Sequence, residues 1–184
     1  IALLSHDGSF LKEVNIKTAA NRDWEDMVLA NGPVAGTNYI YLADIGDNNF
    51  ASSQYHIYRF AEPGKATDTV QECDKIVYQY PDGAHDAEAI LVDNKTKDIY
   101  IITKNDAPSG IYKIAYPQST SLVHTAILCG SLSFTGVTGA AFSPDGTELV
   151  IKTYPTVYYW KLMTDQSVED ALAGTPVTLS YQFE

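Results

Sequence analysis

A segment of the chain recurs three times, and this internal repetition limits the possible folds more than any other feature of the sequence. The copies begin after Asp23, at Asp86 and at Thr138. Each contains four short apolar runs separated by turns rich in Gly, Pro, Asp and Asn, which is typical of four antiparallel strands. The repetition therefore predicts an array of similar β units.

The expected strands can be read from the apolar runs of each copy. They are residues 26–30, 38–44, 55–60 and 75–80, then 88–92, 99–103, 110–115 and 123–128, then 139–142, 148–152, 157–160 and 177–183. Residues 1–10 and 11–17 match only the third and fourth strands of such a unit. The one expected helix is 167–173, which ends before Gly174 and Pro176.

Four-stranded repeats with Asp-Gly turns are typical of propeller blades. We therefore predict an all-β fold, a β-propeller of four-stranded antiparallel blades, with about three and a half blades in one partial domain, 1–184. Propellers use about four to eight blades, so we expect either a fragment or a homodimer that completes the ring. A β-sandwich is the alternative, because evenly spaced strands also occur there.

Composition and charge exclude some partners. Acidic residues outnumber basic ones by 23 to 12, which leaves a net charge of −11 and no basic stripe for nucleic acid. No apolar run reaches the length of a membrane span. The negative charge suits cation binding or extracellular solubility.

Three residues favour a secreted protein. Cys73 and Cys129 allow one disulfide, which we expect to join the outer strands of adjacent blades. The triplet that begins at Asn94 is a glycosylation acceptor in a polar turn. Together with the acidic composition, these features predict an extracellular glycoprotein.

Carboxylates gather at equivalent places in the first two copies. Asp23 and Glu25, and then Asp86 and Glu88, precede or begin the innermost strand, and Asp47 and Asn48 follow the second strand of the first copy. In a propeller these places surround the central channel, where like charges repel unless a cation or proton intervenes. Oxygen ligands of this kind suit calcium, so these six residues are the predicted metal site.

Two other interpretations stay open for the same residues. Asp47, Asn48 and Asn49 are also ordinary turn residues. Ion pairs with Arg22, Lys104 or Lys152 could neutralise Glu25 and Glu88 without a metal.

Several strings resemble a family of largely uncharacterised secreted propellers. They are Asn21-Arg-Asp-Trp-Glu-Asp26, Tyr41-Leu-Ala-Asp-Ile-Gly-Asp-Asn48, Tyr58-Arg-Phe-Ala-Glu-Pro63, Asp86-Ala-Glu-Ala-Ile90 and Ile102-Thr-Lys104. This family is distantly similar to NHL-type, strictosidine-synthase-like and phytase-like propellers. The resemblance implies a six-bladed ring whose axis often holds calcium, which in the better-known relatives supports lactone, ester or phosphate-ester hydrolysis.

Other catalytic patterns are weaker. The four histidines show no metal-binding spacing, and no Gly-x-Ser-x-Gly string is present. His85 lies beside Asp86 and is the one candidate general base, although a hydrogen-bonded surface histidine would look the same.

The sequence thus supports two functional hypotheses. The first is a calcium-binding propeller with hydrolase ancestry, and the second is a non-enzymatic module that binds a protein, a glycan or a small molecule. Whether the protein is an enzyme stays open.

Overall fold

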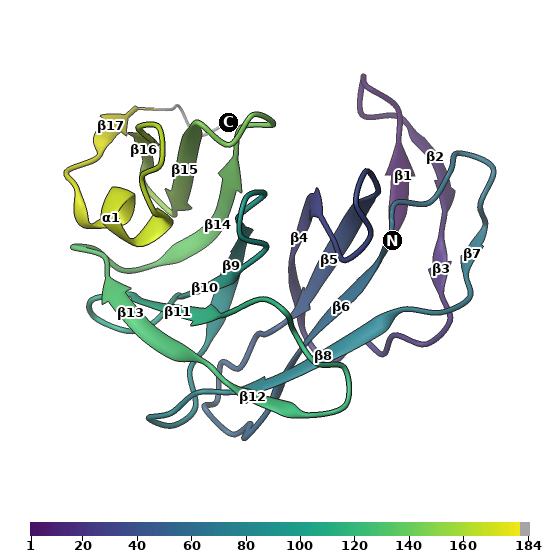
Figure 1. Ribbon diagram of the computed structural model, residues 1–184, viewed down its shortest axis with the longest axis horizontal. Coiled ribbons are helices and arrows are strands. Elements are labelled where there is room, and N and C mark those ends of the chain that lie inside the picture. The colour runs from purple at the N-terminus through teal and green to yellow at the C-terminus, as the bar shows by residue number, and fades with distance from the viewer. Residues whose placement is uncertain (181–184) are drawn as a thin grey trace.

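The computed structural model describes residues 1–180, whose regular secondary structure is almost wholly β-strand (Figure 1). Among these residues no helix has the length and hydropathy that crossing a membrane requires. The elements in chain order are β1 (Ala2–Leu4), β2 (Phe10–Glu13), β3 (Asn15–Ile16), β4 (Trp24–Asn31), β5 (Asn38–Asp44), β6 (Tyr55–Ala61), β7 (Thr69–Val70), β8 (Asp74–Gln79), β9 (Ala87–Val92), β10 (Ile99–Thr103), β11 (Gly110–Ile114), β12 (Val123–Thr125), β13 (Ile127–Ser131), β14 (Val137–Phe142), β15 (Glu148–Thr153), β16 (Val157–Lys161), α1 (Val168–Ala173) and β17 (Val177–Leu179).

Each copy of the repeat forms one sheet. The first sheet has the order β4-β5-β6-β8 with β12 added at its outer edge, the second β9-β10-β11-β13, and the third β14-β15-β16-β17. Within each repeat the strands pair antiparallel. The predicted four-stranded units are confirmed, and the part of the last expected strand at 181–183 lies outside the described residues. The expected strand 123–128 is wrong in part, because residues 123–125 pair with the first sheet as β12 and the fourth strand of the second sheet is β13.

The three sheets follow one another face to face and meet at their innermost strands. β9 contacts both β4 and β14, and Figure 1 shows the sheets spreading outward from this row. One apolar cluster, which includes Ile57 and Ile90, fills the space between the first two sheets, and a second, which includes Leu91 and Ile151, lies between the second and third. Three layers that meet at their first strands resemble propeller blades and differ from the two facing layers of a sandwich.

The second sheet is buried on both faces because it has a neighbour on each side. Ile90, which faces the first sheet, and Leu91, which faces the third, are both fully buried in β9. In β4, Met27 pairs with Leu42 just as Ile90 pairs with Ile101, yet Met27 is 48% exposed. The same strand position is therefore core in one sheet and surface in another.

Short parallel strands tie neighbouring sheets together at their outer edges. β7 comes from the connection between β6 and β8 and pairs with β3, and β12 comes from the connection between β11 and β13 and pairs with β8. In the third sheet the corresponding connection holds α1 instead. The predicted helix is confirmed, with the Ser167 side chain accepting a hydrogen bond from the Asp170 N–H at its N-cap.

The N-terminal residues form only part of a unit. β1 and β2 make a two-stranded sheet, and β3 continues from β2 toward β7. They pack over the outer part of the first sheet, where Ile16, Tyr58 and Phe60 form a third apolar cluster. This arrangement agrees with the expected match to the third and fourth strands of a unit.

The predicted disulfide is wrong, because Cys73 and Cys129 are both free. Cys73 packs on the face of the first sheet that looks away from the second, whereas Cys129 packs between the second and third sheets. Cys129 donates to the Ile111 carbonyl at 3.2 Å, and burial raises the pKa of its thiol to about 11. Two sheets separate the sulfur atoms.

Alkylation of the unfolded, unreduced protein tests this arrangement. We expect iodoacetamide to modify two cysteines per chain, read as intact mass. A chain that iodoacetamide modifies only after reduction would contradict the free cysteines and support the disulfide between Cys73 and Cys129.

The contrast between Ile90 and Met27 gives a matched test of the packing order. Ile90→Ala removes a fully buried side chain, so we expect the free energy of unfolding to fall by about 2–5 kcal/mol. Met27→Ala at the equivalent, exposed position should change it by less than about 1 kcal/mol. Urea unfolding measures both, and equal losses would contradict the placement of the second sheet between two neighbours.

Candidate functional site

Each innermost strand carries one extra residue near its start. These residues are Glu25 in β4, Glu88 in β9 and Thr138 in β14, and each lies where the pairing with the second strand shifts register. A β-bulge leaves the extra residue out of the ladder and redirects its side chain. Two of the three bulges therefore present a carboxylate at the same end of neighbouring strands.

Asp23 and Glu25 lie together against Gly46, which follows β5. A Cβ at position 46 would collide with both carboxylates, so glycine permits their close approach. Asp44 holds the preceding backbone, because its buried Oδ1 accepts hydrogen bonds from the N–H groups of Arg22 at 3.1 Å and Asp23 at 2.7 Å. This carboxylate pair is the centre of the candidate site.

The environment of Glu25 favours its protonated form. Burial and, after it, the negative charges of Glu88 and Asp23 together raise the pKa of Glu25 to about 7. The contribution of this group to the free energy of unfolding therefore falls as the pH rises from 4.5 toward 7. A cation beside Glu25 would offset that loss.

Glu88 already has a positive partner. It forms an ion pair with Lys104, just after β10, and both side chains are less than one-fifth exposed. Burial opposes the charged amine, but hydrogen bonds to Glu88 and Tyr154 raise the pKa of Lys104 above its usual range. The acidic row thus consists of a neutralised half at Glu88 and an open half at Asp23 and Glu25.

The other two expected cations make different contacts. The Arg22 guanidinium donates to the carbonyl oxygens of Asp44 at 3.1 Å and Gly46 at 2.7 Å. Lys152 Nζ lies 3.4 Å from the hydroxyl of Thr138, the bulged residue of the third sheet. Arg22 therefore braces the loop beneath the carboxylate pair.

Asp47 acts as a loop residue. Its carboxylate accepts hydrogen bonds from the N–H groups of Ala51 and Ser52 and from the Tyr55 hydroxyl, which lies 2.9 Å away. These contacts lower the pKa of Asp47 although burial opposes them. Asn48, the next residue, is exposed.

Asp86 joins the first and second sheets. Its Oδ1 accepts the Asp47 N–H and its Oδ2 accepts the Asn105 amide, each at 2.7 Å. Asp86 is 1% exposed. Both oxygens of this predicted ligand are thus engaged within the protein.

His85 lies between two carboxylates. Nε2 is 3.2 Å from Asp82 Oδ1 and 3.1 Å from the Tyr112 hydroxyl. Nδ1 is 2.7 Å from Asp106 Oδ2, without the alignment of a hydrogen bond. A general base needs a nitrogen that faces its substrate, and here both ring nitrogens face protein groups.

Asp26 has a role that the sequence analysis did not foresee. Its Oδ2 accepts the Ile90 N–H at 2.9 Å, so a side chain of β4 bonds directly to the backbone of β9. Burial raises the pKa of Asp26. The sequence signal was a carboxylate inside an otherwise apolar strand, where an unpaired buried charge is costly.

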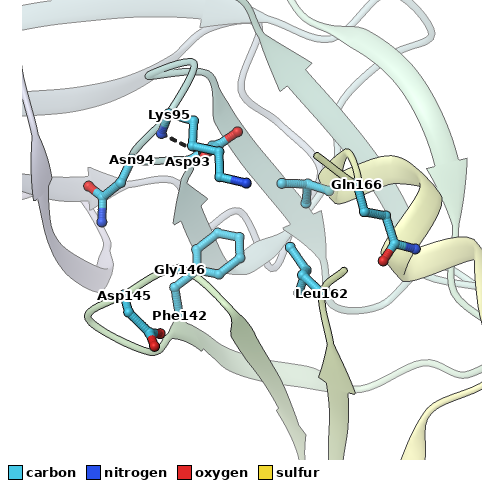
Figure 2. Close-up of a pocket in the computed structure, with 9 residues that line it drawn as sticks. Asp93, Asn94, Lys95, Phe142, Asp145, Gly146, Leu162 and Gln166 are labelled. Atoms are coloured by element: carbon cyan, nitrogen blue, oxygen red, sulfur yellow. Dashed lines mark hydrogen bonds between the residues drawn. The ribbon is translucent and has the colours of Figure 1, made fainter. Parts of the chain in front are cut away.

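Asn94 lies at the opposite end of the innermost strands. Its Oδ1 accepts the Asn31 N–H at 2.8 Å, and glycosylation of its amide stays a prediction. Figure 2 shows Asn94 beside a pocket lined also by Phe142 and Leu162. The pocket volume of about 30 Å³ is that of one water molecule.

The acidic row at Glu25 and Glu88 lies at one end of the innermost strands. A groove of about 520 Å³ near the other end is lined by uncharged side chains, among them Met27, Leu29 and Phe142. Within residues 1–180, no three His, Cys, Asp or Glu side chains are placed to hold one metal ion. Asp23 and Glu25 by themselves therefore do not make a complete metal site.

Comparisons with known proteins give no family. No family model matches the chain, and no curated protein does. Three solved structures are similar: the Dos1 propeller (8% identity, 86% of this chain and 35% of that one, TM-score 0.45), a putative 6-phosphogluconolactonase from Bacteroides fragilis NCTC 9343 (12%, 96% and 63%, 0.40) and a eukaryotic initiation factor (7%, 86% and 55%, 0.33). The chain spans less than two thirds of each. The fold description therefore rests on the strand pairing of the chain itself.

Removing the Asp86 carboxylate tests its structural role. Asp86→Ala leaves the buried Asp47 N–H without its acceptor, so we expect the free energy of unfolding to fall by about 1–3 kcal/mol. Asp68→Ala is the control, because Asp68 is exposed and its side chain forms a surface ion pair with Lys12. It should cost less than about 1 kcal/mol. Thermal unfolding of both variants at pH 7 measures the difference, and equal stability would contradict the role of Asp86.

Proposed function

We propose that this protein is a secreted β-propeller that binds a calcium-type cation beside Asp23 and Glu25. The observation that carries the proposal is the pairing of these carboxylates over Gly46, with the pKa of Glu25 raised to about 7. A site that disfavours a second negative charge gains free energy when a cation replaces the proton.

The described residues would supply a minority of the ligands. Calcium takes about six to eight oxygen atoms. Asp23 and Glu25 offer carboxylates, and Asn48, two residues after Gly46, is exposed. Glu88 would join only if it released Lys104. Water and groups outside the described residues would complete the shell, so we expect weak affinity from this chain alone.

A six-bladed ring is part of the same proposal. The face of the first sheet that carries Met27 is open at β4, while β1, β2 and β3 cover its outer part. The third sheet of a second copy would be obstructed by β1, β2 and β3 at this face. A homodimer is therefore the less favoured way to close the ring.

A binding module without catalysis is the second candidate. The contacts of His85, Asp47 and Asp86 are all directed at the protein itself, which favours this alternative over ester, lactone or phosphate-ester hydrolysis. A protein, a glycan or a small molecule would then be the ligand.

Calcium titration tests the cation proposal. Glu25 must lose its proton to bind calcium, and its pKa lies near 7, so we expect affinity at pH 6 to be about tenfold weaker than at pH 8. Glu25→Gln should abolish the pH dependence and weaken binding by at least tenfold. Isothermal titration calorimetry at both pH values measures each quantity.

The matched control is Glu13→Gln, which makes the same change at an exposed position of β2. It should leave the affinity within about twofold of the wild type. Wild-type protein that takes up no calcium at pH 8, or binding that Glu25→Gln leaves unchanged, would overturn the proposal.

A further inference from the structure

The two-stranded sheet of β1 and β2 is built like the outer half of a four-stranded sheet. Leu11 of β2 is left out of the pairing with β1, between the pairs made by Leu3 and Leu4. Cys129 of β13 is left out of the pairing with β11 in the same way. In addition, β7 pairs with β3, which continues β2, just as β12 pairs with β8. β1 and β2 therefore correspond to β11 and β13, the third and fourth strands of the second sheet.

This half sheet lacks the two inner strands that its counterpart has. β11 pairs with β13 on one edge and with β10 on the other, and β10 pairs in turn with β9. Within residues 1–180, β1 pairs with β2 and with no other strand. The edge of β1 opposite β2 is therefore open, and its main-chain groups are available for pairing.

An apolar surface is exposed next to this half sheet. Met27 and Leu29 of β4 lie on the face of the first sheet that looks away from the second, because Val28 between them packs toward the second sheet. Their partners in β5, Leu42 and Ile40, pack in the third apolar cluster. Met27 is 48% exposed and Leu29 is 53% exposed. The face is thus covered over its outer part and open at its innermost strand, as expected of an interaction surface.

The rest of the molecule shows what covers a face of this kind. The equivalent face of the third sheet is covered by β9 and β10, whose Leu91 and Tyr100 pack in one cluster with Ile151 of β15. Ile151 holds the position in β15 that Leu42 holds in β5, two pairs beyond the bulge of each sheet. The cover is a two-stranded antiparallel hairpin, and its second strand pairs with the third strand of its own sheet.

We propose that the open edge of β1 and the open face at Met27 and Leu29 together bind a β-hairpin of a partner protein. Its second strand pairs antiparallel with β1, as β10 pairs with β11, and its first strand lies against β4, as β9 lies against β14. Main-chain hydrogen bonds to β1 provide affinity, and alternate apolar side chains of the hairpin select for the face at Met27 and Leu29. The hairpin completes a fourth four-stranded sheet.

A hairpin fits this site better than a second copy of the chain does. β1, β2 and β3 occupy the outer part of the face, which excludes a complete sheet. In the described residues, each pair of first and second strands already pairs with a third strand of its own sheet, so a second copy has no free hairpin to offer. Residues 27–30 contain no charged side chain, so the facing side of the hairpin is expected to be apolar. The inference does not depend on cation binding at Asp23 and Glu25.

The test uses a defined probe, a fluorescein-labelled peptide with the sequence of residues 87–103 and one added Lys at each end. In the intact protein this segment is the hairpin of β9 and β10. The side chains that face the first sheet are changed in the peptide, which carries Ile90→Thr, Val92→Thr, Ile99→Thr and Ile101→Thr. Its apolar face is then the one with Leu91 and Tyr100. Fluorescence anisotropy with the full chain should show saturable binding.

Met27→Lys should weaken this binding by at least about tenfold, because it places a charge in an apolar contact. Met163→Lys is the matched control, since it makes the same change at a position that is 69% exposed after β16, and it should leave the affinity within about twofold. Met27→Gln, which adds no charge, should weaken binding by at least about threefold. Circular dichroism checks that each variant is folded. A peptide that also carries Leu91→Thr and Tyr100→Thr should not bind.

Amide hydrogen exchange tests the pairing with β1. At saturating peptide, we expect amides of β1 to gain at least about tenfold protection while those of β17, the outer strand of the third sheet, stay unchanged.

Four results would overturn the proposal. They are the absence of saturable binding, equal affinity in the wild type and in Met27→Lys, binding without protection of β1, and self-association of the wild type that Met27→Lys abolishes. The last result would assign the face to a second copy of the chain.

Discussion

The contact between innermost strands is the constraint on which the rest of the structure depends. β9 lies between β4 and β14, and this row brings three amphipathic or buried sheets face to face, so that two continuous apolar clusters form. Burial of apolar area between the sheets is the main favourable contribution to the free energy of folding. Apolar packing is not directional, whereas the hydrogen bond from the Ile90 N–H to Asp26 fixes where β4 lies against β9.

The electrostatics of the candidate site follow from that row. Because the bulges occur at one register position, Glu25 and Glu88 emerge on neighbouring strands at the same end. Two carboxylates at short range cannot both stay charged without a partner. The protein resolves the conflict in two ways: Lys104 neutralises Glu88, and the pKa of Glu25 rises to about 7. The open half of the row is therefore the place where a cation has most to contribute.

The repeats were predictable because each strand has a local signature of apolar runs and turn residues, and all twelve expected strands have a counterpart or part of one in the structure. The bulges at Glu25 and Glu88 were not, since one extra residue hardly changes an apolar pattern. The short strand β7 carries no signal at two residues, and the expected strand 123–128 did not reveal that its first part, β12, pairs with the first sheet. The predicted disulfide between Cys73 and Cys129 was wrong because sequence spacing does not reveal which face of a sheet a side chain occupies.

Amide hydrogen exchange at Ile90 tests the central contact most directly. If β4 and β9 meet through Asp26, the Ile90 amide is protected in the wild type and loses at least tenfold of that protection in Asp26→Ala, while the amides of β10 keep theirs. An Ile90 amide that exchanges like one in an unfolded chain, or that is equally protected in both proteins, would contradict the arrangement of the sheets around a shared row of first strands.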